Sequence, residues 1–420
     1  MILRTFYGDV YMKLSVIGLG YVGLIQAAGM AKLGYDVIGI DIDDDKIMKI
    51  NSKIPPIYEE GLKEILNEIV PKKFVAIKSL KKGIMDTDVT FICVGTPSKK
   101  QGEMSLHQLE SVLKLVGEIL KEKTYHTFVI KSTVVPGTCE NVVVKGLEKA
   151  SGKKFKEDFS VVMNPEFLRE GTAIEDFFNP DRVVLGSSDD KGLATVKELY
   201  SSFDCPVLLT KFKEAEMIKY ASNAFLATKI SFINEIGNIS KTFGIDTNVV
   251  AKGIGLDSRI DPRFLKSGIG FGGSCFPKDV NAIVYKATEI GYNAKLLRSV
   301  LDVNRDQPLK LIELLDKSVG RIKGKKIGLL GLTFKAGTDD IRESPALIAI
   351  KELLMEEAIL NIYDPKAMDK VKKIFSHLNY LKSGQEVIDE SDVILILTEW
   401  PEFRNLDFGD KLVIDGKNLF

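Results

Sequence analysis

Histidine is rare in this chain, and its scarcity limits the acid–base chemistry that the chain can carry. The 420 residues include only His107, His126 and His377, and none of the three lies in a recognisable motif. Histidine is the usual general base because its pKa lies close to neutral pH. If the chain is an enzyme, we therefore expect other side chains to handle protons.

Cysteine is also sparse, and the four cysteines lie far apart in the sequence, at Cys93, Cys139, Cys205 and Cys275. This spacing in a long chain does not predict a disulfide framework, and it fits a reducing cytoplasm, where we expect the protein to act. No second cysteine lies within sixty residues of Cys275. Neither a zinc knuckle nor a Cys-x-x-Cys redox pair is therefore available there, and we expect no metal site.

Long apolar runs and an excess of charge are missing as well. No apolar run approaches the length that spans a bilayer, so we expect no membrane partner. Lysine and arginine total 58, as do aspartate and glutamate, which gives no net charge. A balanced charge argues against nucleic acid as the main partner, although it leaves room for a local basic pocket that binds phosphate.

The first eleven residues lack the apolar core and cleavage site of a signal peptide. Met12 precedes the first predicted strand and resembles a second start, so we expect residues 1–11 to be dispensable. A chain that starts at Met12 and fails to fold would contradict this expectation.

The most informative segment is GFGGSCFPKD at 270–279, in which Cys275 follows three glycines and precedes a lysine and an aspartate. Glycines allow a substrate to approach the backbone closely, and nearby charges tune a thiol. One interpretation is a lone nucleophile that forms a covalent adduct. The alternative, a small apolar side chain buried in a turn, is the commoner fate of a free cysteine.

A dinucleotide-binding fingerprint opens the chain. A predicted strand at 13–17 leads into Gly18, Gly20 and Gly23 in a G-x-G-x-x-G pattern, a predicted helix follows, and a second strand ends at Asp41. The glycines permit a tight turn and close approach of a pyrophosphate, and the acid binds ribose hydroxyls. Because an acid at Asp41 repels a 2′-phosphate, NAD is favoured over NADP. A glycine turn that only packs a helix is the weaker alternative.

Further predicted strands at 89–94, 127–131 and 160–163 are each followed by a polar loop. Thr96, Thr133 and Glu166 lie in these loops. Since ligands of doubly wound sheets bind at the carboxyl ends of strands, we expect the three residues to line one crevice. Ordinary turn chemistry explains each residue equally well when it is taken alone.

Residues 211–243 show apolar positions at helical spacing before Gly244, which predicts one long helix. Lys219 and Asn223 are four residues apart and share a face of this helix. Beside so much apolar surface, Lys219 either extends to solvent or is partly desolvated and able to act as a base. Without further context, the first alternative is the expected one.

The last hundred residues repeat the opening pattern without its fingerprint. Strands are predicted at 325–331, 360–364, 393–398 and 412–415. Arg342 suits a phosphate, or it forms a surface ion pair with Asp339 or Glu343. The predicted fold is α/β, with two Rossmann-like, doubly wound parallel sheets joined by a long central helix and a helical region. The expected domains are 12–210, 211–308 and 309–420.

At this point the ordered motifs resemble one family, the nucleotide-sugar dehydrogenases that include UDP-glucose and GDP-mannose dehydrogenases. The resemblance runs from about Met12 to the C-terminus. It rests on GLGYVGL at 18–24, VGTP at 94–97, NPEFLREG at 164–171, EMIKYASN at 216–223, GFGGSCFPKD at 270–279, GLTFK at 331–335 and RESP at 342–345.

The resemblance implies oxidation of a sugar CH2OH to a carboxylate by two NAD, through a cysteine thiohemiacetal and then a thioester. It implies that the first domain binds NAD, the central domain dimerises and carries catalytic residues, and the third binds UDP. It implies a nucleotide-sugar substrate and a homodimer or higher homo-oligomer. The implied catalytic residues are Cys275, Lys219, Asn223, Asp279, Glu166 and Thr133.

In these roles Cys275 is the nucleophile, Lys219 and Asn223 stabilise the oxyanions that develop at C6, and Glu166 is the base for thioester hydrolysis. Asp279, with Lys219 and Thr133, orders water or accepts protons. The implied NAD-binding residues are Gly18, Gly20, Val22, Gly23, Asp41, Lys46, Thr96, Thr133, Glu170 and Arg342. The implied substrate-binding residues are Glu166, Phe167, Leu168, Lys219, Asn223, Arg259, Lys266, Phe271, Gly272, Phe276 and Lys335, with Arg259 reaching the sugar of a neighbouring subunit.

The segment NPDRVV at 179–184 is similar to the members that oxidise UDP-glucose, which ranks that substrate first, with UDP-glucuronate as the product. GDP-mannose ranks second, and a UDP-N-acetyl-hexosamine stays open. The sequence IDP at 260–262 stands where many relatives have Ile-Gly, so we expect the loop that carries Arg259 to lie differently from theirs. A one-step hydroxyacid dehydrogenase and a catalytically inactive NAD or nucleotide sensor are the competing functions.

Overall fold

The computed structural model describes residues 12–420, and the expectation that residues 1–11 are dispensable lies outside them. The described chain divides into two units, each with its own core. The C-terminal unit comprises Lys100–Glu103 and Tyr220–Phe420, and the remaining described residues form the N-terminal unit. The boundary falls inside one long helix, between Lys219 and Tyr220. The domain boundaries expected at 210 and 308 stay predictions.

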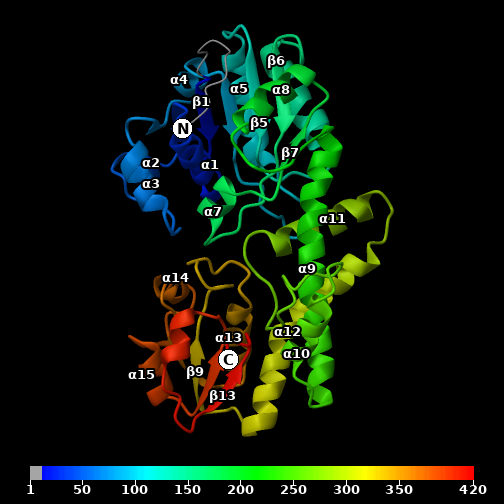
Figure 1. Ribbon diagram of the computed structural model, residues 1–420. Helices are drawn as coiled ribbons and strands as arrows, with labels where there is room; N and C mark the ends of the chain where they lie inside the picture. The colour runs from blue at the N-terminus through cyan, green and yellow to red at the C-terminus, as the bar shows by residue number, and fades with distance from the viewer. Residues whose placement is uncertain (1–11) are drawn as a thin grey trace. The chain divides into compact units, whose positions relative to one another are not determined.

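In residues 12–219, the N-terminal unit is built on an eight-stranded sheet with the order β3-β2-β1-β4-β5-β6-β7-β8 (Figure 1). The first six strands are parallel, whereas β7 pairs with β6 in antiparallel fashion and β8 runs parallel to β7. The strands are β1 (Leu14–Ile17), β2 (Val37–Ile40), β3 (Phe74–Ile77), β4 (Val89–Ile92), β5 (His126–Ile130), β6 (Phe159–Met163), β7 (Val183–Gly186) and β8 (Val207–Thr210).

The connections between these strands are mostly helices, and several begin at a side-chain cap. Asp43 and Ser79 each accept a hydrogen bond from a backbone N–H three residues ahead, which satisfies donors that a helix start leaves open. The helices are α1 (Tyr21–Lys32), α2 (Asp44–Asn51), α3 (Leu62–Ile69), α4 (Leu80–Met85), α5 (His107–Leu120), η1 (Cys139–Val144), α6 (Lys145–Ser151), α7 (Ala173–Phe178) and α8 (Asp190–Leu199).

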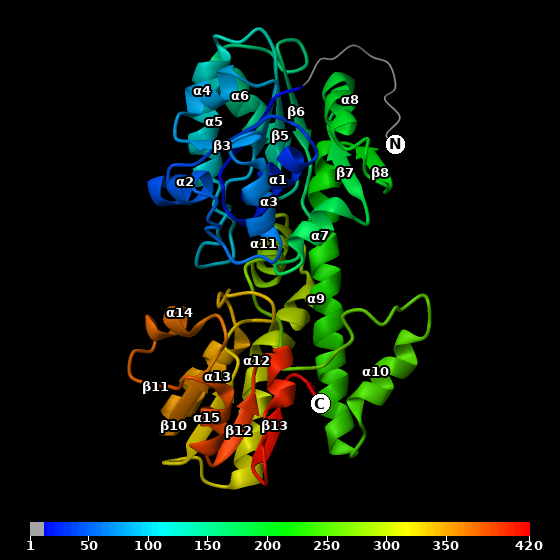
Figure 2. The same ribbon diagram turned by 60° about the vertical axis from the view of Figure 1, so that its left-hand side comes forward.

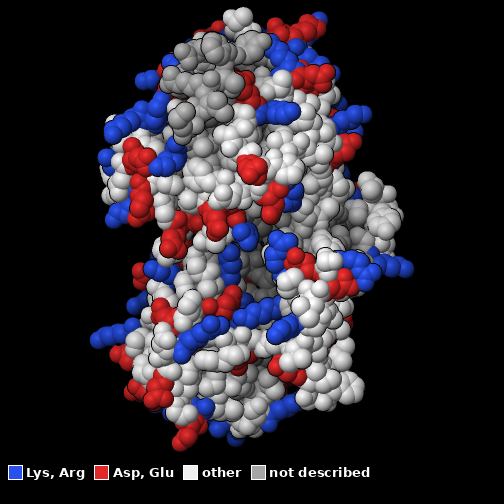
Figure 3. All heavy atoms as spheres, viewed as in Figure 1, with Lys and Arg blue, Asp and Glu red and all other residues white. Residues whose placement is uncertain are grey.

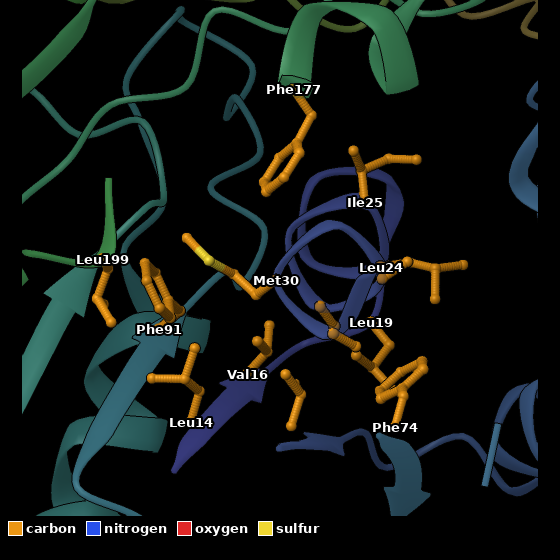
Figure 4. Close-up of a cluster of buried hydrophobic side chains, with 14 of the residues drawn as sticks. Leu14, Val16, Leu19, Leu24, Ile25, Met30, Phe74, Phe91, Phe177 and Leu199 are labelled. Atoms are coloured by element: carbon orange, nitrogen blue, oxygen red, sulfur yellow. The ribbon is translucent and has the colours of Figure 1, made fainter. Parts of the chain in front are cut away.

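The core of the N-terminal unit gathers around β1 and α1. Leu14 and Val16 of β1 and Leu24 and Met30 of α1 are completely buried, and Figure 4 shows these side chains with Phe91 of β4. Because both faces of a parallel sheet are covered, its strands read as continuous apolar runs rather than alternating ones. This packing holds the turn between β1 and α1 in place.

The C-terminal unit, within residues 220–420, contains a five-stranded parallel sheet with the order β11-β10-β9-β12-β13 (Figure 2). The long helix α9 (Phe212–Thr242) leads into this unit from the N-terminal unit. The other elements are α10 (Thr247–Gly255), α11 (Phe276–Glu289), α12 (Lys295–Val319), β9 (Lys326–Leu330), α13 (Pro345–Met355), β10 (Ile359–Tyr363), α14 (Met368–Lys372), β11 (Asn379–Tyr380), α15 (Gly384–Asp389), β12 (Val393–Ile396), η2 (Pro401–Asn405) and β13 (Leu412–Asp415).

Two apolar clusters cover the faces of this second sheet. Leu329 and Leu395 point toward α12 and α13, whereas Leu330 and Ile396 point toward α15 and η2. Because successive side chains along β9 and β12 point to opposite faces, apolar residues pack against helices on both faces of the sheet. The expected fold class, with two Rossmann-like sheets and a long helix, is confirmed.

Two features of the described surface bear on partners. Charged side chains of both signs are scattered over the surface in view, as the balanced composition predicts (Figure 3). Among residues 12–420, none of the helices is long and apolar enough to cross a bilayer.

Candidate active site

The turn between β1 and α1 has the geometry that a pyrophosphate requires. Gly18 has φ +87°, and a Cβ there would lie 2.9 Å from the carbonyl oxygen of Cys93. At Gly20 a Cβ would meet nothing within 4 Å, so the turn is open on that side. Helix α1 begins at the next residue, and its N-terminus favours negative charge. Val22 and Gly23 lie in its first turn.

Asp41 follows β2 and is 8% exposed. Its Oδ2 accepts hydrogen bonds from the Leu19 N–H at 2.7 Å and from Lys46 Nζ at 2.8 Å. Burial opposes ionisation, but the bonds from Lys46 and from backbone N–H groups lower the pKa of Asp41 below its ordinary value. The carboxylate is therefore held ionised beside the glycine turn, where it can accept hydrogen bonds from ribose hydroxyls and repel a 2′-phosphate. These residues fit NAD.

The strands β4, β5 and β6 are neighbours, and the three expected loop residues follow them at the same edge of the sheet. Thr96 donates a hydrogen bond from Oγ1 to the carbonyl oxygen of Thr133 at 2.8 Å. Thr96 is 7% exposed and Glu166 is 6% exposed. The loops therefore do bring these residues to one end of the sheet, as the topology predicts. Glu170 lies in the turn that precedes α7.

Glu166 forms a buried ion pair with Lys219 of α9. Glu166 Oε1 lies 2.9 Å from Lys219 Nζ, and Glu166 Oε2 accepts the Leu168 N–H at 2.7 Å. Burial opposes ionisation of Glu166, yet Lys219, this hydrogen bond and Lys131 together lower its pKa. The expectation that Lys219 extends to solvent is wrong: Lys219 is 3% exposed, because Glu166 supplies a counter-charge inside the unit.

A second buried cation, Lys131, was not predicted from the sequence. Lys131 directly follows β5, is 7% exposed and donates a hydrogen bond to Asn164 Oδ1 at 2.9 Å. Burial lowers the pKa of Lys131 to about 8. A lysine at the end of an otherwise apolar strand was the signal that could have identified it. Phe167 lies beside the pair, with its ring centre 5.4 Å from Lys219 Nζ and 3.8 Å from the Arg182 guanidinium.

In the C-terminal unit, Cys275 occupies the N-cap position of α11. Its carbonyl oxygen accepts the Asp279 N–H at 2.8 Å, and its Sγ lies 3.6 Å from Ser274 Oγ. The side chain is half-buried. This placement differs from a cysteine that only fills a core, because a helix N-terminus stabilises negative charge that develops near it.

Asp279 lies one helical turn beyond Cys275 and is 1% exposed. Asp279 Oδ2 accepts a hydrogen bond from Asn223 Nδ2 at 2.6 Å, and Asp279 Oδ1 pairs with Lys278. The expected catalytic residues Asn223 and Asp279 are therefore in direct contact. A buried carboxylate that keeps two polar partners can remain in place without exposure to water.

The expected substrate-binding residues of this unit form several local contacts. The rings of Phe271 and Phe276 pack edge to face, with centres 5.9 Å apart. A Cβ on Gly272 would lie 2.2 Å from the carbonyl oxygen of Glu343, so this position accepts only glycine without a shift of the backbone. Lys335 Nζ lies 5.8 Å from the Phe334 ring centre.

Three further basic residues were expected to bind ligands. Arg342 forms an ion pair with Asp340, a partner that was not considered from the sequence, where Asp339 and Glu343 were. Arg259 pairs with Asp257, and its side chain is 87% exposed. Lys266 helps to lower the pKa of Glu399, against the effect of burial.

The residues with expected catalytic roles are thus divided between the two units. Thr133, Glu166 and Lys219 belong to the N-terminal unit, and Asn223, Cys275 and Asp279 belong to the C-terminal unit.

Comparison with known proteins identifies the family. Models of the UDP-glucose/GDP-mannose dehydrogenase family match its NAD binding domain at residues 12–204, its central domain at 213–306 and its UDP binding domain at 328–420. A UDP-glucose 6-dehydrogenase of Haloferax volcanii is 42% identical over 97% of each chain. A GDP-mannose 6-dehydrogenase of Pseudomonas syringae is 40% identical over 94% of this chain and 93% of its own.

A solved structure supports the same assignment. The UDP-glucose dehydrogenase of the archaeon Pyrobaculum islandicum has a TM-score of 0.95 and 39% identity, over 99% of this chain and 96% of its own. NAD is the cofactor that the matched binding domain and the turn at Gly18 both indicate. This chain therefore belongs to the UDP-glucose/GDP-mannose dehydrogenase family, a family of NAD-dependent nucleotide-sugar 6-dehydrogenases.

Proposed function

We propose that this protein is a UDP-glucose 6-dehydrogenase that oxidises the C6 hydroxymethyl group to a carboxylate in two steps, through a covalent bond to Cys275. The observation that carries this proposal is the position of Cys275 at the N-cap of α11, one turn before the Asp279–Asn223 pair. A single oxidation of an alcohol has no use for a thiol in this position. Bound NAD would accept the hydride in each of the two oxidations.

In the proposed mechanism the side chains of the protein bind C6 covalently and transfer protons between the two oxidations. Removal of a hydride and a proton from the C6 hydroxymethyl group gives an aldehyde. The thiol of Cys275 then loses its proton and its sulfur forms a bond to C6, while the C–O double bond opens and the oxygen takes up a proton, which gives a thiohemiacetal. Loss of a second hydride and the hydroxyl proton leaves a thioester.

Hydrolysis completes the reaction. Glu166 takes a proton from water, the water oxygen bonds to C6, and the C6–S bond breaks while the sulfur of Cys275 regains a proton. Lys219 and Asn223 stabilise negative charge on the oxygen at C6 in the transition states. Asp279 and Thr133 order the water. The roles of Glu166 and Lys219 are supported by their pairing at 2.9 Å, which keeps the carboxylate ionised.

The choice of UDP-glucose rests on relatives and on the segment at 179–184. Relatives named UDP-glucose 6-dehydrogenase reach 42% identity, and those named GDP-mannose 6-dehydrogenase reach 40%. GDP-mannose is therefore the second candidate. A UDP-N-acetyl-mannosamine dehydrogenase of Pyrococcus horikoshii is more distant, at 28% identity.

A panel of UDP-glucose, GDP-mannose and the two UDP-N-acetyl-hexosamines tests both the substrate and the stoichiometry. We expect UDP-glucose to give the highest kcat/KM and to yield two NADH for each sugar oxidised. One NADH per sugar would refute the two-step mechanism. Preference for GDP-mannose would refute the substrate assignment, and no NADH with any sugar would favour the sensor function.

We also propose that the protein forms a homo-oligomer through α9. Phe225, Phe232 and Ile239 are spaced seven residues apart on this helix and are 65%, 49% and 50% exposed. Such a stripe on one face suits a helix that packs against a second copy. Phe232→Asp should shift the mass measured by light scattering toward the monomer, while an unchanged mass would contradict this interface. The cytoplasmic location stays a prediction.

A further inference from the structure

Four side-chain amides of the C-terminal unit bind the backbone of the segment at 266–272, which is expected to bind the substrate. Asn304 of α12 accepts the Phe271 N–H with its Oδ1 at 2.7 Å and donates from Nδ2 to the Phe271 carbonyl oxygen at 3.0 Å. One planar side chain thus satisfies both backbone groups of a single residue. Asn304 was not singled out from the sequence, because an asparagine outside any recognised motif carries no distinct signal.

A second pair of amides holds Gly268 in the same manner. Its N–H donates to Asn234 Oδ1 of α9 at 2.7 Å, and its carbonyl oxygen accepts from Gln307 Nε2 of α12 at 2.8 Å. Asn234 is completely buried and Gln307 is 6% exposed. Asn418 adds a bond from Nδ2 to the Ser267 carbonyl oxygen at 2.7 Å.

The backbone of the segment is shaped to accept this arrangement. Gly270 has φ +106°, and a Cβ there would lie 2.8 Å from Asn304 Oδ1. A side chain at 270 would therefore displace the amide that holds Phe271. Glycine at this position serves the approach of Asn304, in addition to any approach of a substrate.

The bound segment also contacts the residue next to the nucleophile. Phe271 is 6% exposed, and its ring packs edge to face against Phe276, the first residue of α11. Cys275 directly precedes Phe276. A shift of the Phe271 backbone would therefore move a ring that packs against the start of α11, where the thiol is located.

We propose that Asn304 is a positioning residue that fixes the backbone of Phe271 and, through the ring of Phe276, the position of Cys275, with Asn234 and Gln307 holding the adjoining turn. This inference rests on the proposed function, because it assigns the segment to substrate binding. It assigns residues of α9 and α12 to the support of the site, without direct contact with the substrate.

Three variants of the full-length protein test the proposal. Asn304→Leu keeps the branched shape of the side chain and removes both hydrogen bonds. Asn304→Asp keeps the acceptor for the Phe271 N–H and removes the donor. Asn293→Leu is the matched control at an exposed position just before α12. The measurements are amide hydrogen exchange across 266–273, the rate of Cys275 alkylation by iodoacetamide followed by peptide mass spectrometry, and kcat/KM for UDP-glucose.

We expect Asn304→Leu to speed exchange of the Phe271 amide at least tenfold, because its acceptor is gone. A displacement of about 1 Å at a reacting group lowers rates about 100-fold, so kcat/KM should fall by about that factor. Asn304→Asp should retain slow exchange and lose about tenfold in kcat/KM. NAD affinity should stay unchanged in both variants, and the control should match the wild type.

Unchanged exchange in Asn304→Leu would overturn the proposal, as would faster exchange with unchanged alkylation and kcat/KM. If Asn304→Leu does not fold, a wild-type kcat/KM in Asn304→Asp overturns it. If the wild-type protein oxidises no nucleotide sugar, the proposed function is wrong, and the exchange and alkylation rates still decide whether Asn304 positions Cys275.

Discussion

Replacement of Glu166 by glutamine separates the two halves of the proposed reaction. Glutamine keeps the volume of the side chain, and its one amide oxygen can still accept either the Leu168 N–H or a bond from Lys219, which bond to different oxygens of Glu166. It cannot take a proton from water. The steps up to the thioester on Cys275 should therefore proceed, while hydrolysis of the thioester should become slow.

The expected magnitude follows from the role of a general base. Loss of such a base lowers a rate by about 10²–10⁴-fold, which corresponds to about 3–5 kcal/mol of barrier. The same change leaves Lys219 buried at 3% exposure without its counter-charge. Disruption of a buried ion pair costs about 3–5 kcal/mol of folding stability, so thermal unfolding must be measured alongside activity.

The assay mixes a known amount of Glu166→Gln with NAD and UDP-glucose and records NADH absorbance in a stopped-flow instrument. We expect a burst of two NADH per active site followed by a steady rate at least 100-fold below that of the wild type. Mass spectrometry of the quenched protein should show the UDP-glucuronoyl adduct, a thioester through C6, on the peptide that contains Cys275. Glu118→Gln, at an exposed position of α5, is the control and should turn over normally.

A steady rate within threefold of the wild type would refute the assignment of Glu166 as the base. A burst without an adduct on Cys275 would refute the covalent step instead. The two failures are distinguishable because one is read from the rate after the burst and the other from the mass of the protein.

Four further predictions follow from contacts in the two units. Cys275→Ser should form no adduct and release no uronate, as measured by mass spectrometry and by product analysis; normal turnover would exclude the thioester. Asp41→Ala should weaken NAD binding by about 10–100-fold in a fluorescence titration, because charged hydrogen bonds contribute about 1.5–3 kcal/mol. The lowered pKa of Glu166 stabilises the folded protein above the ordinary glutamate pKa, and this contribution is lost as the pH falls through the pKa of the folded state. The difference in the free energy of unfolding in urea between the wild type and Glu166→Gln should therefore become smaller in acid. Because the folded pKa of Lys131 is about 8, the wild type should gain stability relative to Lys131→Met between pH 8 and about 10, where only the unfolded chain binds the proton.

Much of the fold could be predicted because local patterns and topology agree. The apolar strand before Gly18, the glycine spacing and the acid at Asp41 together specify one turn, and the structure has it. The strands at 74–77, 183–186, 207–210 and 379–380 were not predicted. The strand at 207–210 exposes Leu208 and Leu209 at the edge of the sheet, so it lacks the buried apolar pattern that marks a parallel strand. The antiparallel pairing of β6 with β7 depends on tertiary packing and has no local signal.

The pairing of charges could not be predicted from the sequence. Lys219 and Glu166 are separated by more than fifty residues, and only the folded chain brings them to 2.9 Å. A lysine next to apolar residues is compatible with solvent or with burial, and the choice depends on whether a carboxylate is available inside. For the same reason, the partner of Arg342 was expected among its neighbours Asp339 and Glu343, although the folded loop presents Asp340.

The scarcity of histidine and the buried ion pair of Glu166 with Lys219 both bear on which side chain acts as the base. His126 lies in β5 and is completely buried, and burial lowers its pKa to about 3, so its imidazole is uncharged at neutral pH. Glu166, in contrast, is kept ionised: burial opposes its ionisation, but Lys219 lowers its pKa below the ordinary glutamate value. A base that is already ionised does not titrate between pH 5 and 8. If Glu166 acts as proposed, the rate of thioester hydrolysis should vary little over that range, and a steep acid limb centred near pH 6.5 would point to a histidine instead.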